Sequence, residues 1–146
     1  RGQGMIIVQQ LTPAHAKAIG IQKAQLSVGV LLETEGYVES LISAGPAYAC
    51  LADNKVIAMA GVSMFWKGRG HAWATIADNG RPYLKAITKE VLNFLKFTSI
   101  SRIETSVDCR FDAGHKWARM LGFEKEGTMR SWGPNGENYD LYSRVK

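Results

Sequence analysis

The pattern that most restricts the fold of this chain lies in its last third, residues 102–146. A β-rich run, Arg102–Asp108, is followed by Asp112, a residue that can cap the start of a helix. Gly122 stands where such a helix would end in a left-handed residue, and Phe123 can fold back onto its last turn. These signals follow one another closely, so a strand followed at once by a short helix is predicted.

Two further strands are predicted after this helix, over residues 123–132 and 137–145. The segment between them, Gly133-Pro134-Asn135-Gly136, combines a fixed φ with residues that accept positive φ, which is typical of a tight turn. The helix itself has apolar residues at i, i+3 and i+4 spacing, which predicts one buried face formed by Trp117, Met120 and Leu121.

This C-terminal part also contains a series of short motifs: Val107-Asp108, Leu121-Gly122-Phe123, Glu126-Gly127, Arg130, Gly136, Asp140 and Leu141-Tyr142-Ser143. Together they resemble the GNAT superfamily of N-acyltransferases, most closely the branch that acetylates protein and ribosomal-protein N-termini and small amines. The resemblance implies the GNAT fold of the α/β (α+β) class. Such a fold has a mixed, mostly antiparallel sheet with a central pair of splayed parallel strands, flanked by helices.

The rest of the chain predicts the remaining elements of that fold in order. Strands are predicted over residues 5–9, 48–52, 56–66 and 71–77. Thr12 is predicted to cap a helix that has Pro13 at its first position and runs to about Gly20. Further helices are predicted from Thr34 or Glu35 to Gly45-Pro46, and from Pro82 to Thr98. The apolar stripe predicted for the last helix is Leu84, Ile87, Val91, Leu92 and Leu95. Residues 21–34 give no clear pattern. One domain over residues 5–146 is expected, with Arg1-Gly2-Gln3-Gly4 a remnant of an expression vector before Met5.

The composition is that of an ordinary globular protein, with 46% hydrophobic and 21% charged residues among 146. No apolar run approaches the length of a membrane span, and no secretion signal precedes the first strand. Two cysteines, Cys50 and Cys109, are expected to be buried free thiols, which suits a cytoplasmic location. The basic residues behind the net charge of +5 are scattered, and the His and Cys residues lack metal-ligand spacing.

The four tryptophans divide into two pairs. Trp73 and Trp117 are expected in the core. Trp66 and Trp132 flank turns and are expected to be half exposed, where either could line an acceptor or partner surface.

The resemblance also implies where a cofactor would bind. In this family the pantetheine of acetyl-CoA lies between the parallel strands, here 71–77 and 102–108, and bonds to backbone around Thr75, Ile76 and Ala77. Its pyrophosphate would then lie at the start of the next helix. The phosphate loop departs from the family pattern, because Asp78 adds a negative charge and Pro82 lacks an N–H group. Two interpretations remain open for Asn79, Gly80 and Arg81: a phosphate cradle or an ordinary loop.

The acid and base of an acyl transfer are less certain in this sequence. Ala118 stands where many family members have a tyrosine, while Phe111 and Gly114 replace an asparagine and a serine at the cofactor side of the helix. Gly114 leaves room there, and His115 could protonate a thiolate. Candidate bases are Glu33, Glu35, Asp78 and Glu104. Glu104 lies within a strand, where a salt bridge to a neighbouring strand explains a charge equally well.

Three functions follow from these observations. The first is transfer of an acetyl group from acetyl-CoA to a primary amine by direct attack in a ternary complex. The second is a GNAT-fold binding or structural protein with a degenerate CoA loop, such as the GNAT-like proteins encoded by phages. The third, a basic nucleic-acid-binding module, has no supporting motif. The acceptor amine is not indicated, and a homodimer is left open.

Overall fold

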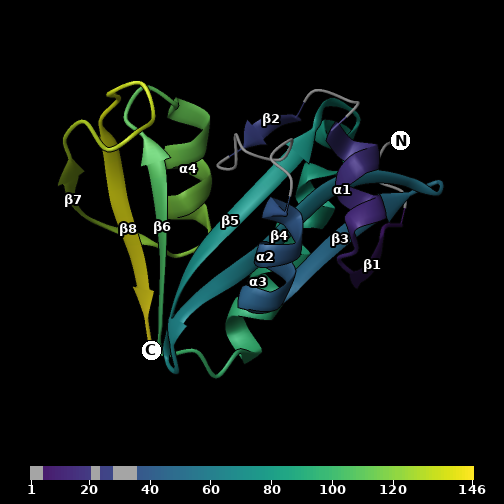
Figure 1. Ribbon diagram of the computed structural model, residues 1–146, viewed down its shortest axis with the longest axis horizontal. Helices are drawn as coiled ribbons and strands as arrows, with labels where there is room; N and C mark the ends of the chain where they lie inside the picture. The colour runs from purple at the N-terminus through teal and green to yellow at the C-terminus, as the bar shows by residue number, and fades with distance from the viewer. Residues whose placement is uncertain (1–4, 21–23, 28–35) are drawn as a thin grey trace. The chain divides into compact units, whose positions relative to one another are not determined.

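The computed structural model describes residues 5–20, 24–27 and 36–146 of the chain (Figure 1). Its elements are β1 (Ile7–Gln10), α1 (Pro13–Gly20), β2 (Ala24–Ser27), α2 (Tyr37–Ala44), β3 (Ala47–Ala52), β4 (Lys55–Trp66), β5 (Arg69–Ala77), the 3-10 helix η1 (Asp78–Tyr83), α3 (Leu84–Phe97), β6 (Arg102–Asp108), α4 (Asp112–Met120), β7 (Glu124–Met129) and β8 (Tyr139–Val145). The described strands pair in the order β1-β3-β4-β5-β6-β8-β7, and β2 pairs with β5. The registers are antiparallel except between β5 and β6, which confirms the mixed, mostly antiparallel sheet.

The chain divides into two compact units that share strands β4 and β5. The first consists of Arg1–Ser63 and Trp73–Thr98, and the second of Met64–Ala72 and Ser99–Lys146. The two units are described in turn. The single domain expected over residues 5–146 stays a prediction.

In the first unit, helices cover both faces of the sheet. Alternate residues of β3 divide between the faces, as the two-residue period of a strand requires. Ala47 and Ala49 join a core with Ala16 of α1 and Leu41 of α2. Tyr48 points to the other face, where its ring meets Phe94 of α3 edge to face at 6.2 Å. The apolar sides of α1 and α2 thus bury one face, and that of α3 buries the other.

The start of α1 confirms the cap predicted from Thr12 and Pro13. The hydroxyl oxygen of Thr12 accepts the backbone N–H of His15 at 3.4 Å, and the imidazole Nδ1 of His15 accepts the backbone N–H of Thr12 at 3.0 Å. Two of the amides that a helix start leaves without partners are therefore satisfied reciprocally.

In the second unit, β6 is paired along both edges. Its first three residues pair in parallel with β5, from Arg69↔Arg102 to His71↔Glu104. On its other edge β8 pairs over its whole length, and β7 pairs with β8 in turn (Figure 1). Helix α4 packs against β6 on one face of this sheet.

The end of α4 confirms the predicted stop signal. Gly122 has a φ of 91° and its N–H donates to the carbonyl of Arg119 at 3.0 Å. The N–H of Phe123 donates to the carbonyl of Ala118 at 3.0 Å, and the Phe123 side chain is buried. This pair of bonds is the Schellman motif, which only a residue that tolerates positive φ completes without strain.

Some predicted boundaries are wrong. β5 begins at Arg69, because the turn before it consists only of Lys67 and Gly68, the latter with a φ of 94°. Pro82 does not open α3; it lies inside η1, and α3 begins at Leu84. The hairpin strands β7 and β8 are shorter than predicted, ending at Met129 and beginning at Tyr139. The predicted start of the second helix at residues 34–35 lies outside the described residues.

The predicted burial of two helices also needs correction. Leu92 of α3 is 38% exposed, so it does not belong to the buried stripe. In α4, Met120 is 64% exposed, whereas Ala118 and Leu121 are buried. Asp112 is the first residue of α4 and not its cap, since that position belongs to Phe111 and has no side-chain hydrogen bond. The buried side of α4 therefore consists of Ala118 and, at the end of the helix, Leu121.

The tryptophans largely follow the prediction. Trp73 is buried at 8% exposure, while Trp66 and Trp132 are exposed at 61% and 51%. Trp117 is only partly buried, so the prediction that it lies in the core is wrong. Both cysteines are free thiols, and Cys50 is buried whereas Cys109 is partly exposed. None of the helices in the described ranges is long and apolar enough to cross a membrane.

Candidate functional site

In the first unit, the end of β5 is already paired with a strand of the same chain. Thr75, Ile76 and Ala77 are buried, and their backbone pairs with β2 in the register Ser27↔Thr75, Leu26↔Ile76 and Ala24↔Ala77. This strand comes from the segment whose sequence gave no clear pattern. The backbone groups predicted to bind a pantetheine are thus the ones that β2 engages.

The loop after β5 is shaped by packing at Gly80. This residue is buried in η1, and a Cβ atom there would collide with the backbone carbonyl oxygen of Ile57 on β4. The absence of a side chain is therefore explained by the neighbouring strand. Asn79 lies beside it with a buried side-chain oxygen that has no hydrogen-bond partner among the described residues. Arg81 follows on the exposed side, and Pro82 offers no N–H group.

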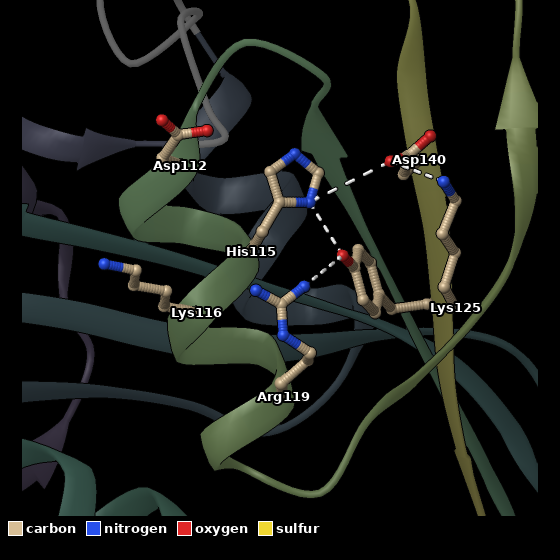
Figure 2. Close-up of a pocket in the computed structure, with 7 residues that line it drawn as sticks. Asp112, His115, Lys116, Arg119, Lys125 and Asp140 are labelled. Carbon is tan, nitrogen blue, oxygen red and sulfur yellow. Dashed lines mark hydrogen bonds and ion pairs between the residues drawn. The ribbon is translucent and has the colours of Figure 1, made fainter.

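In the second unit, His115 of α4 lies in a hydrogen-bonded cluster between the helix and β8 (Figure 2). Its Nδ1 is 2.7 Å from the hydroxyl of Tyr142, and its Nε2 is 3.0 Å from the backbone carbonyl oxygen of Asp108. A carbonyl oxygen can only accept, so the neutral ring carries its proton on Nε2. Nδ1 then accepts the phenol proton of Tyr142. The tautomer of His115 is thus inferred from its hydrogen-bond partners, and the imidazole is linked to the phenol of Tyr142.

A buried carboxylate, Asp140, lies beside this pair. One oxygen accepts hydrogen bonds from Thr128 at 2.7 Å and Cys109 at 3.2 Å, while the other lies 3.3 Å from Lys125 and 3.9 Å from His115 Nδ1. Burial alone would raise the pKa of Asp140, but the bonds from Thr128, Cys109 and Lys125 outweigh it and lower that pKa. Asp140 is therefore an ionised group that completes the surroundings of His115.

The side chains around this cluster border an open hollow of about 350 Å³. It is lined by Asp112, His115, Lys116, Arg119, Lys125, Asp140 and Tyr142. Asp140 and Tyr142 belong to the C-terminal sequence motif, but the motif alone did not show that they face His115. Their i, i+2 spacing on a strand, pointing to the side covered by α4, was the available signal.

Two of the predicted cofactor residues pack against each other. A Cβ atom on Gly114 would lie 2.7 Å from the ring of Phe111 and 2.8 Å from a methyl group of Val107. The expectation that Gly114 leaves room near the helix start is wrong, because the Phe111 ring fills that space. Ala118, which replaces the family tyrosine, is buried at 4% exposure.

Glu104 occupies a network of ions on β5, β6 and β7. Its carboxylate accepts bonds from Arg69 and Arg102, each at 2.7 Å. Arg102 in turn forms a pair of 2.8 Å bonds with Glu126. The bond from Arg69, followed by that from Arg102, lowers the pKa of Glu104 despite its burial. The salt bridge to a neighbouring strand is confirmed, and a catalytic role for Glu104 stays a prediction. Glu33 lies outside the described residues.

Comparison with known proteins gives no match to a protein-family model and no match among curated proteins. Solved structures do match over nearly the whole chain. An N-acetyltransferase from Staphylococcus aureus Mu50 is 12% identical with a TM-score of 0.78, over 97% of this chain and 98% of that one. The ribosomal-protein-S18-alanine N-acetyltransferase from Escherichia coli is 14% identical with a TM-score of 0.76, over 97% and 94%.

A third match is the ribosomal-protein-S5-alanine acetyltransferase from Vibrio fischeri, which is 18% identical with a TM-score of 0.69, over 96% of this chain and 92% of that one. Identities this low show the fold and leave the chemistry to the site. The strand order, the parallel pairing of β5 with β6 and the extent of these matches together establish that this chain has the fold of the GNAT N-acetyltransferases.

Proposed function

We propose that this chain is an N-acetyltransferase that transfers an acetyl group from acetyl-CoA to a primary amine by direct attack in a ternary complex. The observation that carries the proposal is the fold match, because it spans 96–97% of the chain and includes enzymes that acetylate ribosomal proteins. Amine acylation requires little of a protein beyond positioning the reactants and moving a proton. A fold that provides both is therefore suited to this reaction.

The described residues do not fit the cofactor in their present arrangement. β2 occupies the backbone of Thr75–Ala77, and Gly80 is explained by its contact with β4. A backbone N–H donates to one partner at a time, so β2 would have to leave this edge before a pantetheine could pair with it. The proposal therefore requires a rearrangement of β2, and cofactor binding is the first property to measure.

Among the candidate acids and bases, we favour His115 for moving a proton. Its two ring nitrogens are already joined to Tyr142 and to a carbonyl oxygen, so the ring can pass a proton to or from the phenol. Glu104 is neutralised by two arginines, which makes it the weaker base. Glu33 remains a candidate base from sequence alone. The cytoplasmic location also remains a prediction.

Calorimetry with acetyl-CoA and CoA tests the proposal, with Arg81→Glu beside the wild type. Lys89→Glu is the matched control, since it reverses one exposed charge in the middle of α3. Micromolar binding that Arg81→Glu loses and Lys89→Glu keeps supports the proposal, and an amine screen with mass-spectrometric detection then follows. No binding at millimolar cofactor by folded protein contradicts it.

A second candidate function is a binding or structural protein of this fold without acyl transfer, of the kind phages encode. The pairing of β2 with β5 favours it, because that pairing satisfies the strand edge without a cofactor. In this case calorimetry finds no binding of either cofactor, and the fold serves only as a scaffold.

A further inference from the structure

The hollow between α4 and the β7–β8 hairpin has an excess of positive charge. Its lining contains three permanent cations, Lys116, Arg119 and Lys125, against the two carboxylates Asp112 and Asp140. Figure 2 shows Arg119 on the helix pointing toward Tyr142 and Lys125 on the strand side extending to Asp140, whereas Asp112 and Lys116 lie on the other side of the helix. The inner part of the hollow is therefore bordered by cations from both elements.

Arg119 has most of its hydrogen-bonding capacity to spare. Within the described ranges its guanidinium donates one hydrogen bond, from Nη1 to the hydroxyl oxygen of Tyr142, at 3.4 Å. A guanidinium has five N–H donors in a planar fork that matches the oxygens of a carboxylate or phosphate. The long bond to Tyr142 orients the fork and leaves four donors for another partner.

Lys125 contributes a second cation that remains accessible. It lies 3.3 Å from Asp140, yet its side chain is 53% exposed. Asp140 also accepts bonds from Thr128 and Cys109 at its other oxygen, so this carboxylate is fully hydrogen-bonded, and Lys125 is the cation that offsets its charge. An incoming anion would meet the ammonium of Lys125 and not an unpartnered carboxylate.

We propose that this hollow binds a small oxyanion, either a phosphate or a carboxylate group, with Arg119 as its main ligand and Lys125 as the second. The hydroxyl oxygen of Tyr142 accepts a hydrogen bond from the guanidinium and so orients it, and the same hydroxyl is hydrogen-bonded to His115. The site lies wholly within the second unit and does not depend on acyl transfer. It would give the protein an affinity for phosphorylated or acidic ligands that the fold alone does not predict.

The test is an NMR titration of backbone amides at pH 7 with inorganic phosphate, with acetate, and with sodium chloride at equal ionic strength. Wild type, Arg119→Gln and Lys89→Gln are compared; both substitutions remove one exposed positive charge, but Lys89 lies in α3 of the other unit. We expect saturating shifts in α4 and β7 with phosphate or acetate, and a dissociation constant raised about fivefold or more by Arg119→Gln, from the loss of one close charge. Lys89→Gln should leave it unchanged.

Two results would overturn the inference. One is equal shifts with sodium chloride, which would mean general ionic screening. The other is equal weakening by Arg119→Gln and Lys89→Gln, which would mean a response to net charge. The phosphate and acetate titrations show which oxyanion is preferred, and a parallel titration with CoA separates this site from the proposed cofactor site.

Discussion

Replacing Gly80 by alanine distinguishes packing from cofactor binding as the reason for this glycine. The added Cβ would run into the carbonyl oxygen of Ile57, and it would lie 3.2 Å from a methyl group of Ile76. A side chain could rotate away from such a contact, but a backbone carbonyl within β4 cannot. The φ of Gly80 lies outside the left-handed region, so backbone strain does not contribute.

The magnitude follows from two opposing effects. Overpacking in a tight interior costs about 1–3 kcal/mol, and the contact with backbone places Gly80→Ala toward the upper end. The smaller entropy of the unfolded alanine chain returns about 0.4–1 kcal/mol. A net loss of roughly 1–2 kcal/mol is expected, which for a chain of this size lowers Tm by about 2–8 °C.

Thermal unfolding followed by circular dichroism measures this loss. Gly127→Ala is the control, because a Cβ atom there has nothing within 4 Å and the φ is not positive. Its Tm should equal or slightly exceed that of the wild type. If Gly80→Ala unfolds at the temperature of Gly127→Ala, the contact with β4 is not what excludes a side chain, and the loop glycine needs another explanation.

Three further predictions concern packing, pH and thiol reactivity. Gly114→Ala should destabilise the protein by about 1 kcal/mol in urea unfolding, because the Phe111 ring has to move while helix propensity improves; an unchanged midpoint would contradict this packing. The bonds from Arg102, then from Ser143, lower the pKa of Glu126 from 4.5 to about 2. The contribution of Glu126 to stability is thus complete above pH 4.5 and is lost as the pH falls through about 2, so the stability gap between wild type and Glu126→Gln at pH 6 should shrink steadily between pH 4.5 and pH 2. Burial raises the pKa of Cys50 to about 11, so a thiol reagent at pH 8 should label it only after denaturation.

Local signals predicted some features correctly, although Asp112 and Pro82 did not mark the helix starts expected of them. Thr12 and Gly122 each act through hydrogen bonds within a few residues, so the local pattern determines the structure there. The C-terminal order of strand, helix and hairpin was readable for the same reason. It was also what pointed to the GNAT fold before any comparison.

The candidate site was less predictable because it depends on contacts between distant segments. Whether Gly80 faces a phosphate or a strand depends on Ile57, more than twenty residues earlier. Likewise, the role of His115 depends on Tyr142, which no helical period could reveal. β2 was missed because its pairing with β5, and not its own composition, makes it a strand.

The position of β8 between β6 and β7 has a consequence for how the protein is made. A ribosome produces β6 first, then α4 and β7, and only afterwards the strand that joins them in the sheet. Until β8 has emerged, the edge of β6 that it will occupy and the facing edge of β7 both expose unpaired amides and carbonyls. Exposed edges of this kind invite pairing with other nascent chains. Synthesis of this half of the molecule therefore passes through a stage that is open to aggregation.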